Sequence, residues 1–171
     1  MKTSFIYFGL TLCYLSFPSP THGKVYSTCL DGWMPFNGSC YLFAHGDAKL
    51  TFTGAEHFCR QHSNSHLVHV NDALENDFIK DHLRDLKPNH WWIGITDEDI
   101  EGVWKWFDTD NVASFTDWQP NDHSHNDEDC AIFVSVYDFK WADTPCNTPN
   151  TVFPPICETS SRSCEEAVVV G

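Results

Sequence analysis

Helical patterns of apolar residues are confined to two segments in the first half of the chain. The first follows a capping box that starts at Thr53 and ends at Glu56, and it predicts a helix over residues 54–63. The second runs from Asn71, which can cap a helix, to Pro88, which stops one. Its helically spaced apolar residues are Leu74, Phe78, Ile79, Leu83 and Leu86. Both segments should therefore bury one face.

Runs of aromatic and β-branched residues predict strands elsewhere. These runs cover residues 39–43, 91–95, 103–107, 131–136 and 151–157. The pattern fails over residues 108–129, a polar stretch interrupted by Pro120 that is too long for an ordinary connection. Because tryptophans such as Trp118 flank this stretch, we expect an ordered functional loop there.

The N-terminus has the pattern of a secretory signal peptide. Lys2 precedes an uncharged apolar run over residues 5–17, and small residues lead to Gly23, after which we expect cleavage. This run is too short to span a bilayer, and no later segment is long and apolar enough to do so. We therefore expect a secreted, extracellular protein with a signal peptide at 1–23, one domain at 24–158 and a short tail at 159–171.

Cysteine usage agrees with export. Of the eight cysteines, Cys13 lies in the expected signal peptide, so an odd number remains. An oxidising compartment allows disulfides to persist, and three bridges with one unpaired cysteine are expected, with fifteen connectivities open to six cysteines. The unpaired residue could be Cys164 in the polar tail. It could link two chains as a disulfide-bonded homodimer or stay free or capped, and the sequence leaves both open.

One N-glycosylation sequon begins at Asn37. It lies directly before Cys40, in a segment that has the pattern of a tight hairpin. Because a tight hairpin could leave the sequon unused, the sequence leaves the glycosylation of Asn37 open.

Acidic residues are concentrated in the second half of the chain. The net charge of −14 argues against nucleic acid as a partner, and most of it lies between Asp97 and Asp143. Two clusters, at residues 97–101 and 119–130, lack the pattern of an EF-hand loop. Carboxylate and amide oxygens are the ligands that calcium prefers, so ligands from separate loops could hold Ca²⁺ here. The alternative is a solvated acidic surface.

Several motifs, taken in order, resemble the C-type lectin domain of the long form. They cover residues 29–158 and are Cys29 with Trp33, Cys40, Cys59, Trp92-Ile93-Gly94-Ile95, Gln119-Pro120-Asn121, Glu128-Asp129-Cys130, Trp141-Ala142-Asp143, Cys146 and Cys157. The resemblance implies an α+β fold with two helices, antiparallel sheets and a long irregular loop region. It also implies a cis form of Pro120 and disulfides that join Cys29 to Cys40, Cys59 to Cys157, and Cys130 to Cys146.

The resemblance further implies two calcium sites. The ligands of the family's sugar-binding calcium correspond here to Gln119, Asn121, Glu128 and Asp143. A fifth ligand position holds Ala142 instead of asparagine, which removes one calcium ligand and one donor to a sugar hydroxyl. Because affinity follows ligand number and charge, this calcium should bind more weakly. A second, structural site corresponds without a gap to Asp97, Glu101, Asp122 and Asp129.

The resemblance implies that the sugar contacts the ligands of the first calcium. In the family, Glu and Asn beside the proline go with mannose-type sugars, and Gln and Asp go with galactose-type sugars. Gln119 and Asn121 are a hybrid of the two pairs and assign no monosaccharide. The leading hypothesis is a secreted calcium-dependent lectin that recognises glycans on microbial or self surfaces. The alternative is a lectin-like interaction or matrix protein that keeps structural calcium alone and binds protein or mineral.

Catalytic and zinc chemistry find less support in the sequence. No nucleophile, base and orienting residue form a recognisable pattern, so we expect no enzyme. His62, His66 and His69 could suggest zinc, but their spacing is irregular, and packing or surface positions are favoured. Most of the tryptophans should pack in the core.

Overall fold

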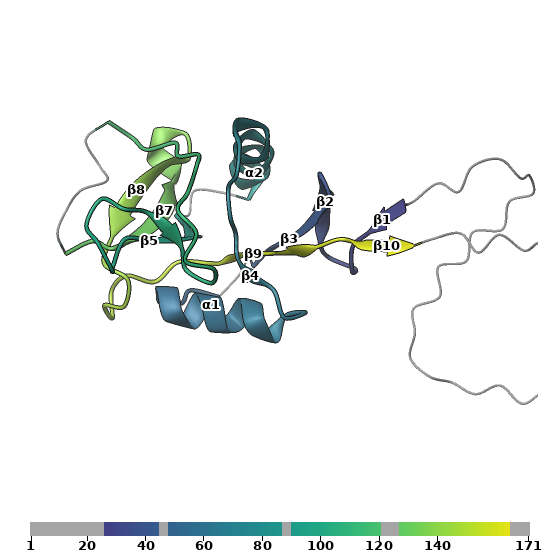
Figure 1. Cartoon of the computed structure of the whole chain (residues 1–171), viewed down its shortest axis with the longest axis horizontal. Helices are drawn as coiled ribbons and strands as arrows, with labels where there is room; N and C mark the ends of the chain where they lie inside the picture. Colours follow the sequence, from purple (N-terminus) through teal and green to yellow (C-terminus); the bar gives the residue numbers. More distant parts are fainter. Residues whose placement is uncertain (1–25, 45–47, 87–89, 121–126, 165–171) are drawn as a thin grey trace, which may run out of the picture.

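The computed structural model describes residues 26–44, 48–86, 90–120 and 127–164 (Figure 1). The expected signal peptide lies outside the described residues, as do Pro88 and the two expected calcium ligands Asn121 and Asp122. Neither helix of the described part is long and apolar enough to cross a membrane.

Two α-helices and three small antiparallel sheets make up the described part of the fold. The helices are α1 (Phe52–Gln61) and α2 (Ala73–Asp85). One sheet has the order β2 (Met34–Phe36), β3 (Ser39–Phe43), β9 (Ile156–Ser160) and β4 (His66–Leu67). A second has the order β6 (Lys105–Trp106), β5 (Trp91–Thr96), β7 (Cys130–Val134) and β8 (Lys140–Thr144). The third pairs β1 (Tyr26–Thr28) with β10 (Arg162–Cys164). The α+β fold class is therefore confirmed.

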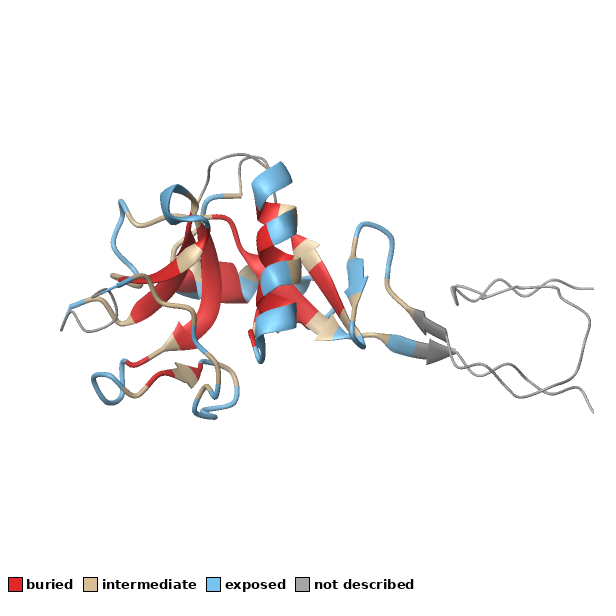
Figure 2. Cartoon of the chain, turned by 90° about the horizontal axis from the view of Figure 1, so that it is seen from above, coloured by how far each residue is buried: buried red, intermediate tan, exposed pale blue. Residues whose placement is uncertain are grey.

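The β1–β10 pair and the β5–β8 sheet lie at opposite ends of the described part of the molecule. Figure 1 places the β1–β10 pair at one end and the β5–β8 sheet at the other, and Figure 2 shows the same separation from above. We expect the domain to end at residue 158, but β9 runs on to Ser160 and β10 follows it.

Helix α1 begins two residues before the predicted start. Thr51 caps it and accepts a hydrogen bond from the backbone N–H of Gly54, so the capping box placed at Thr53 was wrong. Phe52, almost fully buried, decides the start, because it anchors the first turn in the core. Glu56 turns away from the cap and accepts the backbone N–H of Leu67 at 2.8 Å.

Helix α2 is capped by Asp72, and the prediction of Asn71 as its cap was wrong. Asp72 accepts the N–H of Glu75 at 2.9 Å, and the Glu75 carboxylate accepts the N–H of Asn71 at 2.7 Å. This reciprocal pair satisfies two donors at the helix start, which one cap at Asn71 could not do. Leu74 is 73% exposed and lies off the buried face, contrary to the predicted stripe.

Strand predictions succeeded best where the strands are buried. The predicted strands 39–43 and 91–95 match β3 and β5, whereas the strand predicted over 151–157 starts only at Ile156. Residues 135 and 136, predicted as strand, lie instead in a 3-10 turn, Ser135–Tyr137, after β7 ends. The short or polar strands β1, β2, β4, β8 and β10 had no periodic signal long enough to be predicted.

The predicted hairpin at Asn37 is confirmed. Asn37 and Gly38 have φ angles of 43° and 90° and join β2 to β3, which matches a two-residue turn with both central residues left-handed. Asn37 is exposed at the tip of this turn. The sequon is therefore accessible in the folded chain.

Strand β5 is buried on both faces and separates two hydrophobic clusters. Trp91, Ile93 and Ile95 face one cluster, which includes residues of α2, while Trp92 faces the other, which includes residues of α1. Gly94 lies so close to β4 that an added Cβ would stand 2.6 Å from the carbonyl oxygen of Leu67. Glycine is thus required for this approach of the two sheets.

The three implied disulfides form. Cys29 pairs with Cys40, Cys59 with Cys157, and Cys130 with Cys146, with Cα–Cα distances of 5.6, 5.3 and 5.1 Å. The second bridge ties α1 to β9, and the third ties the start of β7 to the segment that follows β8. The third bridge therefore constrains the acidic residues that directly precede Cys130.

Candidate functional site

The loop that carries Gln119 is held against β8 by backbone hydrogen bonds. The N–H of Gln119 donates to the carbonyl oxygen of Trp141 at 2.9 Å, and the N–H of Trp141 donates to the carbonyl oxygen of Asp117 at 2.9 Å. The ring of Trp118 stands nearly perpendicular to that of Trp141, with 5.5 Å between the ring centroids. These contacts place Gln119 beside the strand that carries Ala142 and Asp143.

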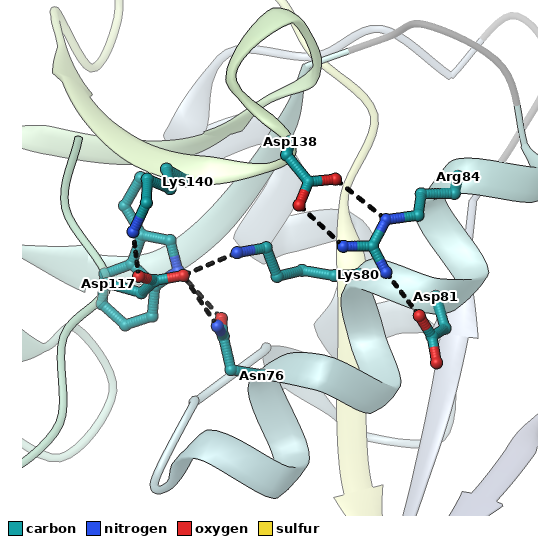
Figure 3. A network of polar contacts seen from close by, with 8 residues as sticks. Asn76, Lys80, Asp81, Arg84, Asp117, Asp138 and Lys140 are labelled. Atoms are coloured by element: carbon teal, nitrogen blue, oxygen red, sulfur yellow. Dashed lines mark hydrogen bonds and ion pairs between the residues drawn. The ribbon is translucent and has the colours of Figure 1, made fainter.

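The carboxylate of Asp117 fixes the start of this loop. It accepts hydrogen bonds from Lys80 at 2.6 Å, Lys140 at 2.7 Å and Asn76 at 2.9 Å (Figure 3). Burial raises the pKa of Asp117, but the hydrogen bonds from Lys140, Lys80 and Asn76 outweigh it, so the pKa is lowered overall. Asn76 also accepts from the indole N–H of Trp141, which joins the loop to α2 and β8 through one network.

Beside this network a further ion pair joins α2 to the turn between β7 and β8. Arg84 donates two hydrogen bonds to the two oxygens of Asp138, both at 2.9 Å (Figure 3). Because both side chains are largely exposed, this pair orients the turn more than it stabilises the fold.

Ala142 and Asp143, the two residues that follow Trp141, are consecutive residues of β8. Ala142 pairs with Ile132 and Asp143 with Ala131 of β7, and both are buried. Ala142 packs in the second hydrophobic cluster with Trp92 and Ile132. The alanine is therefore accommodated as a core residue at a position where the family has a ligand.

Across the same sheet, Asp97 and Asp129 lie at the adjoining ends of β5 and β7. The N–H of Asp97 donates to the carbonyl oxygen of Asp129 at 3.1 Å, next to the paired residues Thr96 and Cys130. Asp97 also accepts the N–H of Gly102 at 2.8 Å on one carboxylate oxygen. Two segments far apart in sequence are thus joined where the expected structural calcium ligands lie.

Asp97 has the electrostatics of a cation ligand. Its other carboxylate oxygen, Oδ1, is buried without a hydrogen-bond partner. Burial raises the pKa of Asp97, and the neighbouring carboxylates of Glu101 and Asp129 raise it further. A buried carboxylate oxygen without a donor is costly, and a bound cation would remove that cost. This donor set fits a hard cation such as Ca²⁺.

The expected ligands come together in part. Asp97, Glu101 and Asp129 interact electrostatically, and Gln119 lies beside the strand of Asp143. Glu128 is half-buried and directly precedes Asp129. In the described part of the chain, one set of three His, Cys, Asp or Glu ligand atoms lies within 4.8 Å of one another, and it is His66, His69 and Asp108 rather than an acidic set.

The implied cis form of Pro120 is wrong. The described residues contain no cis peptide bond, so the bond from Gln119 to Pro120 is trans. For a bond before proline the trans form is favoured intrinsically by about 0.5–1 kcal/mol. The hydrogen bond from Gln119 to Trp141 therefore forms with the peptide bond before Pro120 in its trans form.

Sequence reasoning missed two groups of residues. The first is Asn76 and Lys80, two polar residues four apart on the buried face of α2. A buried lysine needs a partner of opposite charge, and this signal could have been read from the sequence. The partner is Asp117. The trio of His66, His69 and Asp108 was missed because Asp108 lies far along the chain from the two histidines. The expected packing of the tryptophans is confirmed, and those almost fully buried are Trp91, Trp92, Trp104, Trp106 and Trp141.

Comparison with known proteins gives one family. The model of the Lectin C-type domain family matches residues 48–159. The chain is 35% identical over 146 residues to asialoglycoprotein receptor 1 of Mus musculus, covering 81% of this chain and 47% of that protein. It is 33% identical to a C-type lectin of Micrurus corallinus, covering 81% of this chain and 90% of the relative. The chain thus spans about half the length of the mouse receptor and nearly all of the shorter lectin.

Solved structures show the same fold. The carbohydrate-recognition domain of the mouse scavenger receptor C-type lectin superposes with a TM-score of 0.66 at 32% identity, covering 79% of this chain and all of that domain. The cow CD23 carbohydrate-recognition domain, determined in the presence of a GlcNAc2Man3 oligosaccharide, superposes with a TM-score of 0.67 at 26% identity, covering 80% of this chain and 99% of that one.

Proposed function

Because the chain belongs to the C-type lectin domain family, we propose that it is a secreted, calcium-dependent carbohydrate-binding protein and not an enzyme. The observation that carries the proposal is the hydrogen bond from Gln119 to Trp141, which brings two of the expected sugar-site segments together. The relatives support it, since the mouse and cow domains above are named for carbohydrate recognition.

The proposed sugar site uses oxygen ligands from three segments. Gln119, Asn121, Glu128 and Asp143 would hold a calcium ion and also contact the sugar. Calcium in such a site coordinates hydroxyl oxygens of the sugar, and the amide and carboxylate groups of its ligands donate and accept hydrogen bonds to the same hydroxyls. Two backbone hydrogen bonds, donated by Gln119 to Trp141 and by Trp141 to Asp117, would pre-organise one side of this site.

A structural calcium site is proposed next to it. Asp97, Glu101, Asp122 and Asp129 would hold this ion, and the buried unpartnered oxygen of Asp97 supports the assignment. The ion would neutralise the mutual repulsion of these carboxylates. It would also fix the segment after β5 against the segment before β7, from which Glu128 would reach the sugar site.

Glycan retention tests the proposal directly. The protein, purified from the medium of cells that express the full chain, is passed over immobilised mannose-type and galactose-type glycans in calcium and again in EDTA. The proposal would be supported if the glycan column retains the protein in calcium and if both EDTA and the Glu128→Gln substitution abolish that retention. Retention unchanged by chelation, or turnover of the glycan, would contradict it.

Ala142 favours a second candidate function. The buried alanine offers no oxygen to the sugar-site calcium. The alternative is therefore a protein that keeps structural calcium alone and binds another protein or a mineral. A calcium-independent type II antifreeze protein shares the fold, with a TM-score of 0.67 at 23% identity over 80% of this chain and 98% of that one. Binding to a protein or mineral surface that free sugars do not compete would favour this alternative.

The chain ends are also part of the proposal. A signal peptide at 1–23, a domain at 24–158, a tail at 159–171 and a homodimer through Cys164 stay proposals. Strand β10 ends at Cys164 at the end of the molecule opposite the β5–β8 sheet (Figure 1). A disulfide there would leave both sugar sites facing outward and would raise avidity without new contacts. Mass measurement with and without reductant tests the dimer.

A further inference from the structure

Three potential metal ligands meet at a place that the proposed lectin function does not use. His66 lies in β4, His69 follows two residues after that strand, and Asp108 follows β6. One ligand atom from each lies within 4.8 Å of the others. The trio shares no residue with either proposed calcium site, and two of its members offer nitrogen rather than oxygen.

His66 is oriented as a metal-binding histidine is. Its Nδ1 lies 2.8 Å from the carbonyl oxygen of Leu67, and because a carbonyl only accepts, Nδ1 carries the proton. The lone pair is therefore on Nε2. A ligand histidine in proteins usually donates its other ring N–H to a backbone carbonyl or carboxylate in this way.

The His69 ring is held by packing. It stacks on the buried ring of Trp106, with 4.6 Å between centroids and 18° between planes, and its centroid lies 4.2 Å from that of His66. Its backbone N–H donates to Glu158 at 3.1 Å. Burial and the neighbouring His66 together lower the pKa of His69 to about 4, although Asp108 opposes them.

Asp108 supplies the charge. Its Oδ1 lies 2.6 Å from Nε2 of His69, and its side chain is only 10% exposed. Arg60 is the nearest opposing cation, 3.8 Å from the other oxygen of Asp108, but it is 42% exposed and also pairs with Glu56. A flexible, solvated arginine can move away as a metal ion enters.

We propose that His66, His69 and Asp108 form a binding site for a divalent transition-metal ion, with Zn²⁺ as the best match. Imidazole nitrogen suits zinc and other late transition metals, whereas calcium and magnesium prefer oxygen. Three protein ligands leave a fourth position to water in a tetrahedral zinc site. The ion would tie β4 to the segment after β6, and thereby join two sheets that belong to different parts of the fold.

Small side-chain movements would complete the geometry. Ligand atoms around tetrahedral zinc lie roughly 3.3 Å apart, so the widest pair must close by at most about 1.5 Å. The hydrogen bond between His69 and Asp108 opens, and the proton of the neutral His69 ring moves through solvent from Nε2 to Nδ1, which leaves the Nε2 lone pair for the metal. Without a metal, the same contact is an ordinary hydrogen bond that positions His69.

Zinc titration of the intact protein tests the site. Zn²⁺ is titrated into chelator-treated wild type with excess calcium present, so that the acidic sites are occupied. We expect one zinc ion per chain, and an affinity that falls at least about tenfold in His66→Gln and in Asp108→Asn. The matched control is His57→Gln, an exposed α1 histidine that contacts Gln61, and it should leave zinc affinity unchanged. Equal affinity in all four proteins would overturn the proposal.

A measurement on wild type alone covers the case in which a variant does not fold. The chain has ten histidines, and their imidazole nitrogen resonances can be followed by NMR as zinc is added. At the first equivalent of zinc, the Nε2 resonances of His66 and His69 should shift while those of the other histidines do not. First shifts at other histidines would contradict the site. Either result leaves the sugar proposal untouched, since that rests on other residues.

Discussion

Gln119 donates its backbone N–H to the carbonyl oxygen of Trp141 at 2.9 Å. This bond joins the irregular loop to β8, the strand whose next two residues are Ala142 and Asp143. A loop and a strand separated by more than twenty residues therefore lie side by side. The proposed sugar site depends on this placement, and several changes should alter it in measurable ways.

Removal of the Asp117 charge should destabilise the fold and loosen the loop. Asp117→Asn leaves the buried Lys80 without its counter-charge, so we expect a loss of roughly 1.5–3 kcal/mol in the free energy of unfolding at neutral pH. Urea denaturation measures it. The conservative control is Asp110→Asn, an exposed residue in the same loop region, which should change stability little.

The same variant should reveal a pH dependence. The pKa of Asp117 is lower in the folded than in the unfolded chain, so its stabilisation is complete above the ordinary aspartate pKa of about 3.9. It is lost as the pH falls through the lowered folded value. The stability difference between wild type and Asp117→Asn should therefore be constant near neutrality and shrink in acid. A difference that grows on acidification would be inconsistent with the network in Figure 3.

Asp97→Asn should separate calcium binding from folding. The variant loses the charge of the buried carboxylate, whose Oδ1 has no hydrogen-bond partner, so the calcium-free protein should be at least as stable as wild type. The rise in Tm on adding calcium should shrink, because a ligand charge is missing. Calorimetric melting with and without calcium measures both. An unchanged calcium-induced rise would exclude Asp97 as a ligand.

Ala142→Asn should strengthen sugar-site calcium binding. The substitution restores a ligand at the fifth position of the site, and affinity follows ligand number. Ala142→Ser, which adds a shorter polar group, is the matched control. Both variants place a polar group at a buried position, so both should lose some stability, and only the asparagine should gain calcium affinity. Equal calcium affinity in the two variants would argue for the sugar-independent alternative.

The disulfide at Cys130 should matter to the site beyond its effect on stability. Replacing Cys130 and Cys146 by alanine opens a loop of 16 residues and should cost roughly 3 kcal/mol. Replacing Cys29 and Cys40 opens a loop of 11 residues at a comparable cost, far from the acidic segments. Calcium affinity should fall in the first variant and not in the second. Equal calcium affinities would mean that the bridge does not constrain the ligands.

The fold was predictable where local signals and buried periodicity agree. Trp91 to Ile95 form an unbroken apolar run, and that run became the central strand β5. Helix starts were less predictable, because Thr51 and Thr53 both offer a cap, and the burial of Phe52 decides between them. Strand β8 was missed because its residues 140–144 alternate too briefly to be distinguished from a loop.

The sequence suggested the residues of the candidate site, but it could not give their geometry. The order of motifs named Gln119 and Asp143, and the structure brings their segments together. The anchor formed by Asp117 and Lys80 could not be read from spacing, since its members are 37 residues apart. His69 and Asp108 are 39 residues apart and became neighbours through the packing of Trp106.

Calcium titration into the metal-free protein, repeated with a panel of monosaccharides, tests the central claim most directly. We predict two calcium-binding events by calorimetry, of which the weaker is strengthened by one class of sugar, because the sugar completes the coordination of that ion. One calcium event that is indifferent to every sugar would contradict calcium-mediated sugar binding and leave the interaction-protein alternative.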